Sequence, residues 1–130
     1  MTKAVVQTEF GPFAVDLETE EVEPAADGPQ AKGFTAELPR VVGGDAVGST
    51  VVAVVDRKPP LMISHDAGIT WREAGAGLPK GRAVAIDEDD PDFIVYASRN
   101  RLHVSTDGGV FWRALAVELP EIEAVSLLPG

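Results

Sequence analysis

Two stretches of the chain decide the fold: residues 64–71 read SHDAGITW, and residues 105–112 read STDGGVFW. Both follow the pattern S-x-D-x-G-x-x-W, and their serines lie 41 residues apart. Leucine–proline pairs mark the same period at residues 38–39, 78–79 and 119–120, spaced by 40 and 41 residues. Two independent markers with one period predict an internally repeated fold.

Each repeat is predicted to consist of short strands, because its segments are rich in β-branched and aromatic residues and end at Asp, Pro, Asn or Gly. In the last unit these segments are residues 81–87, 93–98, 101–106 and 110–115. In the unit before it they are residues 40–43, 49–56, 61–65 and 69–74. Four strands in about 41 residues is typical of one blade of a β-propeller.

The two ends of the chain together supply a third unit. Residues 3–23 align without a gap with the last three strands of the final unit, which places Val5 on Ile94. The motif is lost there, and its Ser, Asp, Gly and Trp positions hold Asp16, Glu18, Glu20 and Glu23. Residues 121–128 (EIEAVSLL) match the missing first strand. We therefore expect an all-β propeller chain of three four-stranded blades, one of them split between the termini.

A length of 130 residues corresponds to one domain, which we assign to residues 1–130. The predicted blades cover residues 121–130 plus 1–25, residues 38–77 and residues 78–118, with a loop over residues 24–37.

The two motifs resemble the Asp-box, or BNR, repeat of sialidases, sortilin-type receptors and photosystem II assembly factors, all of them β-propellers. In such a turn the Ser and Asp side chains can accept backbone N–H groups, Gly supplies a positive φ, and Trp can pack between sheets. Phe111 stands where the family prefers threonine. The structural residues of the two boxes are Ser64, Asp66, Gly68, Trp71, Ser105, Asp107, Gly109 and Trp112.

Three blades are too few for a closed propeller, which typically has four to eight. An open arc leaves two blade faces and a sheet edge uncovered, and such surfaces associate. We expect a head-to-tail homodimer with six blades, in which the C-terminal strand of one chain joins the N-terminal strands of the other. The alternatives are a fragment of a longer protein and a subunit that assembles with another protein partner.

The chain is acidic: 11 Lys and Arg oppose 21 Asp and Glu, for a formal net charge of −10. Nucleic acid and membrane surfaces are therefore not expected as partners, because their negative charges are repelled. The absence of Cys excludes disulfides, thiolate nucleophiles and Cys-based metal sites. Since neither a signal peptide nor an apolar span is recognisable, a cytoplasmic location is the default and an exported form is the alternative.

The resemblance to sialidases implies glycoside hydrolysis, which in that family needs three substrate-binding arginines, a tyrosine nucleophile with a glutamate, and a carboxylic acid/base. The single tyrosine, Tyr96, falls on a predicted second strand, away from the channel. Arg82 lies beside a predicted channel strand and Arg40 near another. We therefore predict no catalytic residues and no cofactor.

Other candidates for chemistry have a structural interpretation. Residues 87–92 (DEDDPD) carry five carboxylates but lack the spacing of a calcium loop, so no metal site is predicted. His65 and His103 fall in different repeats without a fixed partner. Trp71 and Trp112 occupy equivalent positions, which favours packing between blades over stacking on a sugar.

The loop after the first unit is the most individual feature of the chain. From the turn to the next Leu-Pro pair it spans 22 residues, against 14 in the other two units. Insertions in repeats often bind ligands or partners, and an idle surface loop is the alternative. We name Lys32, Phe34, Arg40 and Arg82 as binding residues. The sequence predicts a non-catalytic binding or assembly module, with a carbohydrate-active protein, either lectin or degenerate glycosidase, as the alternative.

Overall fold

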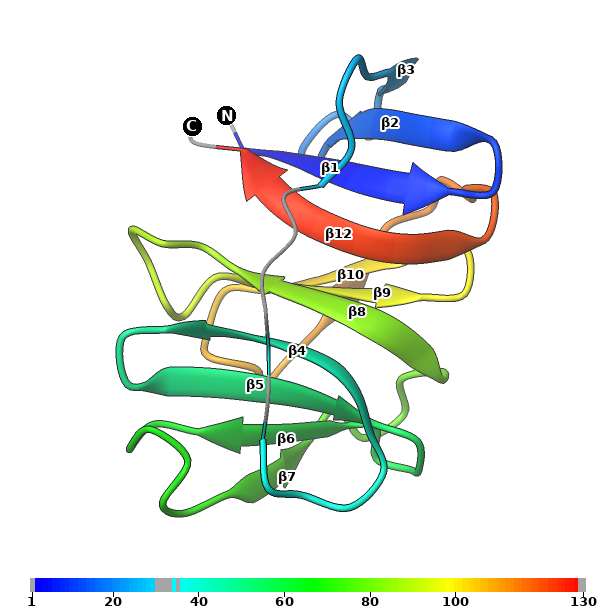
Figure 1. Cartoon of the computed structure of the whole chain (residues 1–130). Coiled ribbons are helices and arrows are strands. Elements are labelled where there is room, and N and C mark those ends of the chain that lie inside the picture. Colours follow the sequence, from blue (N-terminus) through cyan, green and yellow to red (C-terminus); the bar gives the residue numbers. More distant parts are fainter. Residues whose placement is uncertain (1, 30–33, 35, 129–130) are drawn as a thin grey trace.

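The computed structural model of the chain describes residues 2–29, 34 and 36–128. Its strands form three four-stranded antiparallel sheets (Figure 1). The split sheet contains β12 (Ile122–Leu128), β1 (Lys3–Thr8), β2 (Gly11–Asp16) and β3 (Val22–Pro24). The central sheet contains β8 (Gly81–Ile86), β9 (Ile94–Ser98), β10 (Leu102–Ser105) and β11 (Arg113–Ala114). The β4–β7 sheet contains β4 (Val41–Val47), β5 (Thr50–Val55), β6 (Leu61–Ser64) and β7 (Arg72–Ala74).

The prediction of an all-β chain with three four-stranded units is confirmed, including the sheet that combines strands from both ends. In that sheet β12 pairs with β1 of the same chain, with Val125 opposite Val6. The fourth strands are shorter than predicted, because residues 69–71 and 110–112 belong to the preceding turns. None of the described residues forms a helix that is long and apolar enough to cross a membrane.

The central sheet is covered on both faces. Alternate residues of β8 point to opposite sides: Ala83 and Ala85 pack with the split sheet, and Val84 and Ile86 pack with the β4–β7 sheet. The inner strands β12 and β4 both contact β8 and do not contact each other. The split sheet and the β4–β7 sheet are therefore the two ends of a stack, and each has an outer face turned away from the central sheet.

The strand registers correct the alignment of the first unit by one residue. Val6 lies opposite Val125, as Tyr96 lies opposite Val84 in the central sheet, so Val6 is the equivalent of Tyr96. The alignment that placed Val5 on Ile94 is wrong, because a shift of one residue moves a side chain to the other face of a sheet. Val6 packs in the core between the split and central sheets, whereas Val5 belongs to the outer face.

Candidate functional site

The two turns with the S-x-D-x-G-x-x-W pattern are held by their own side chains. In the first turn, Ser64 Oγ donates a hydrogen bond to the Asp66 carboxylate (2.7 Å) and accepts one from the Gly68 N–H (2.8 Å). The Trp71 indole N–H donates to the Gly68 carbonyl (3.0 Å). These bonds close within the turn, so the three side chains and the backbone of Gly68 stabilise the turn itself. The same three contacts recur in the second turn among Ser105, Asp107, Gly109 and Trp112.

The two turns differ in the hydrogen bonds that their aspartates accept. The Thr70 hydroxyl donates to Asp66 Oδ2 at 2.6 Å, and its N–H donates to Oδ1 at 2.8 Å. These hydrogen bonds, with that from Ser64, lower the pKa of Asp66 to about 2. Phe111 stands at the equivalent position of the second turn and supplies only its backbone N–H to Asp107 (3.0 Å). That bond and the one from Ser105 also lower the pKa of Asp107.

The turn between β2 and β3 uses a different residue for the same task. Asp16 Oδ1 accepts hydrogen bonds from the N–H groups of Glu18 (2.9 Å) and Thr19 (3.0 Å). Both bonds lower the pKa of Asp16. The carboxylate that organises this turn therefore lies on the last residue of β2, one position after Val15, which is the residue equivalent to Ser64 and Ser105.

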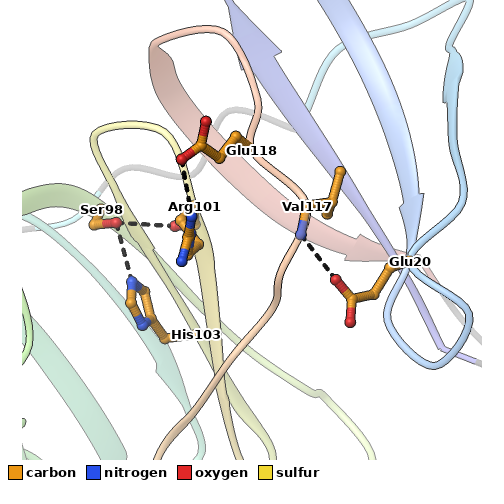
Figure 2. Close-up of polar contacts among 6 residues, drawn as sticks. All are labelled: Glu20, Ser98, Arg101, His103, Val117 and Glu118. Carbon is orange, nitrogen blue, oxygen red and sulfur yellow. Dashed lines mark hydrogen bonds and ion pairs between the residues drawn. The ribbon is translucent and has the colours of Figure 1, made fainter.

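Two arginines join neighbouring sheets. Arg72 Nη2 donates to the Gly108 carbonyl at 2.8 Å, and Arg113 Nη2 donates to the Leu17 carbonyl at 3.2 Å. Each arginine directly follows the tryptophan of its own turn. Glu20, in the turn between β2 and β3, also accepts a hydrogen bond at 2.9 Å from the N–H of Val117, which lies on the connection from β11 to β12 (Figure 2).

A buried histidine and serine lie close together in the central sheet (Figure 2). His103 Nε2 is 3.0 Å from Ser98 Oγ, and the Ser98 hydroxyl donates to the Arg101 carbonyl at 3.1 Å. Because the serine has one proton, its Oγ then accepts from the His103 N–H. Burial, and secondarily the charge of Arg101, lower the pKa of His103. A histidine that donates to the serine does not activate it, so the two residues make a structural hydrogen bond.

An open pocket of about 560 Å³ lies at the edge of the stack where the inner strands β4, β8 and β12 begin. Two ion pairs border it, Lys80 with Asp56 and Arg99 with Glu121, each at 3.2 Å. The Arg82 side chain has no ion-pair or hydrogen-bond partner in the described part of the chain. An arginine of this kind beside apolar residues suits a ligand that carries an anionic group. The pocket is lined by Val42, Asp56, Lys80, Gly81, Arg82, Ser98, Arg99, Glu121 and Ile122.

The structure brings together two of the four residues predicted to bind. Arg82 lines the pocket. Arg40 lies at the same edge, because its carbonyl accepts a hydrogen bond from the N–H of Asp56, which also lines the pocket (2.9 Å). Phe34 does not line it; its ring lies against Gly44 on the outer face of the β4–β7 sheet. Lys32 lies outside the described residues.

Sequence reasoning missed the other charged residues of the pocket. Lys80 and Glu121 directly follow Leu-Pro pairs, and Asp56 and Arg99 directly follow second strands. The antiparallel order of a four-stranded unit brings these two kinds of position to one edge. Their shared place in the repeat was therefore the available signal.

The remaining candidates for chemistry lie in structural positions. Tyr96 is 0% exposed, and its hydroxyl donates to the Pro79 carbonyl at 2.7 Å. In the acidic run, Asp87 and Asp90 accept the N–H groups of Asp89 and Asp92 through their carboxylates. Among the described residues, no three His, Asp or Glu side chains are arranged to hold a metal ion. None of the protein-family models matches the chain, and no curated protein matches its sequence.

Proposed function

We propose that the chain is a non-catalytic binding or assembly module with a propeller-like arrangement of blades. The observation that carries this proposal is that the stack of three sheets has an outer face at each end on which no other sheet of the described chain packs. In a propeller every blade face packs on a neighbouring blade, so a chain with two such faces is suited to bind another set of blades.

The partner we propose is a second copy of the chain, which gives a six-bladed homodimer. In this ring the outer face of the split sheet of each copy packs on the outer face of the β4–β7 sheet of the other. Because β12 pairs with β1 within one chain, two intact three-blade units suffice. The sequence predicts a form in which β12 of one copy pairs with β1 of the other. This exchange of β12 is an alternative form of the same dimer.

Light scattering over a range of micromolar concentrations tests the assembly. We expect the mass to rise with concentration from 13.7 kDa toward twice that value. A mass that stays at one chain over the whole range contradicts the homodimer and leaves a different protein as the partner.

A second candidate function, carbohydrate binding, is favoured by one observation: Arg82 lines an open pocket without an ion-pair partner among the described residues. An acidic saccharide supplies a carboxylate for the guanidinium and a ring face for Val42. Calorimetric titration with acidic and neutral saccharides tests this, with Arg82→Gln as the variant. Binding of the acidic saccharide that Arg82→Gln abolishes supports this function, and no binding of either saccharide contradicts it.

A further inference from the structure

The junctions inside the chain show how one sheet covers the next. Val84 and Tyr96 of the central sheet pack on the β4–β7 sheet, and Val125 and Val6 of the split sheet pack on the central sheet. The equivalent pair in the β4–β7 sheet is Gly44 opposite Ala53, by the same register. This pair lies on the outer face and has the smallest side chains of the three.

Phe34 fills the space that these small residues leave. A Cβ atom at Gly44 would collide with the Phe34 ring, so the ring lies directly on this glycine. Ala53 is 0% exposed although no sheet packs on its face. Phe34 therefore covers Gly44, a position on the face where a neighbouring sheet would otherwise place its own apolar side chains.

The other end of the stack differs from the internal junctions by a reversed charge at one position. Arg72 lies opposite Ile63, Arg113 lies opposite Val104, and at the equivalent position of the split sheet Glu23 lies opposite Ala14. Both arginines donate to a carbonyl in the turn of the next sheet. Glu23 has no proton to donate, and its carboxylate lies 3.7 Å from the Lys3 ammonium.

The surroundings of Glu23 are also acidic. It shares a hollow of about 320 Å³ on the outer face with Asp16 and Glu21, against one lysine, Lys3. In a ring this hollow would meet the turn at residues 64–71 of the second copy. The equivalent of the Gly108 carbonyl is there the carbonyl of Ala67, which accepts no hydrogen bond from the described residues. A carboxylate facing a carbonyl is repelled, because both are acceptors.

We propose that Phe34 and Glu23 restrain self-association of the chain: Phe34 covers one docking face, and Glu23 replaces on the other face the arginine that joins sheets within the chain. This inference rests on the proposed homodimer. It adds that the contact between the two copies is weaker than the junctions between sheets inside the chain. Association therefore requires the Phe34 ring to move off Gly44. It also requires the Glu23 carboxylate to lie close to the Ala67 carbonyl of the second copy, although both groups are hydrogen-bond acceptors.

Sedimentation velocity on five proteins tests the restraint. Phe34→Ala removes the cover, and Glu23→Arg supplies the missing donor. Phe111→Ala is the control for the first change, because Phe111 is 77% exposed on a turn. Glu9→Arg is the control for the second, because Glu9 is exposed in the turn between β1 and β2 and the charge change is the same. Urea unfolding checks that each variant folds.

We expect both variants to lower the dissociation constant of the dimer about tenfold or more, since a charge-assisted hydrogen bond or a freed apolar site has that effect. At physiological salt, where repulsion between the net charges is largely screened, the controls remain like the unchanged chain. If the unchanged chain dimerises and the two variants dimerise equally or more weakly, the restraint is wrong and the dimer stands. If none of the proteins associates, the dimer itself is wrong and the restraint fails with it. Equal gains in the controls also overturn the restraint.

Discussion

The serine of each motif turn holds the turn with two hydrogen bonds of its hydroxyl group. Ser64 is 1% exposed and bonds both the Asp66 carboxylate and the Gly68 N–H. Gly68 has a φ of 89°, a conformation that glycine adopts without strain. The hydroxyl and the glycine therefore fix the turn together.

Replacing Ser64 by alanine leaves the Gly68 N–H without its acceptor. We expect Ser64→Ala to lower the free energy of unfolding by about 1–2 kcal/mol, because the partly buried Gly68 N–H loses its hydrogen-bond acceptor. Urea denaturation measures it. Ser49→Ala is the control, because Ser49 is exposed, and it should change the stability by less than about 0.5 kcal/mol. Equal effects of the two changes would show that the hydroxyl is unimportant.

His103 predicts a pH dependence of stability. Burial lowers its pKa in the folded chain below the ordinary 6.5, so the unfolded chain binds the proton more tightly. The free energy of unfolding therefore falls as the pH drops below 6.5, by up to about 1.4 kcal/mol per pH unit, until the pKa of the folded state is reached. Urea unfolding between about pH 7.5 and 5 measures this slope.

His103→Gln should flatten the dependence in this pH window, because the amide does not titrate and can still donate to Ser98. The exposed His65→Gln serves as the control and should retain the slope. Three carboxylates have a lowered pKa in the folded chain: Asp16, Asp66 and Asp107. Their contribution to the free energy of unfolding is lost only as the pH falls below about 3.8, the ordinary pKa of aspartate, which lies outside the range from about pH 7.5 to 5.

The last strand of the described chain, β12, contacts strands in two of the three sheet layers. It completes the split sheet beside β1 and also contacts β8 of the central sheet. Ile122, at its start, is 2% exposed and belongs to the core between these two sheets. We expect Ile122→Ala to cost about 2–5 kcal/mol, measured by thermal or urea unfolding.

Glu123→Ala, on the same strand but exposed, should cost less than about 0.5 kcal/mol. A small effect of Ile122→Ala would contradict the placement of β12 in the core. It would also favour a chain whose last strand pairs elsewhere.

The strands were predictable from the sequence because their signal is local. Runs such as residues 93–98 (FIVYAS) are continuous and apolar, as strands buried on both faces are. The faces were not predictable at the N-terminus: Val5 and Val6 are the same residue type, so hydrophobicity cannot decide which one faces the core. Only the pairing of β1 with β12 decides it, and that pairing joins residues far apart in sequence.

The β3–β4 connection is longer than the other two because the sheets that it joins are not neighbours. It leads from the split sheet to the β4–β7 sheet, which lie on opposite sides of the central sheet (Figure 1). The other two connections join sheets that are neighbours. The sequence showed the extra length and Phe34, but the contact with Gly44 depends on the order of the sheets in space.

For the whole molecule, the candidate site was predictable only in part. Arg40 and Arg82 were found because the repeat places them near predicted channel strands. The pocket also contains two ion pairs, Lys80 with Asp56 and Arg99 with Glu121. These residues come from loops and strand ends of different units, so they meet only when the three sheets stack. The equivalence of Glu23 with Arg72 and Arg113 was hidden by the alignment error of one residue.

The net charge of the whole chain predicts how salt affects the proposed dimer. Two copies that each carry a formal charge of −10 repel one another, and the screening length is about 10 Å at 0.1 M salt. We therefore expect the dimer to become tighter, by several-fold, as sodium chloride is raised from low to physiological concentration. Sedimentation velocity across a salt series measures this change.

The same series separates general repulsion from the local effect of Glu23. Glu9→Arg and Glu23→Arg make the net charge less negative by the same amount. The repulsion between two copies therefore falls equally in both variants, and the salt dependence of the dissociation constant should weaken to the same extent. Only Glu23→Arg should also tighten the dimer at every salt concentration, because its guanidinium meets a carbonyl at short range, where salt screens little. A dimer that weakens as salt is added would indicate attraction between opposite charges and would contradict the role given to Glu23.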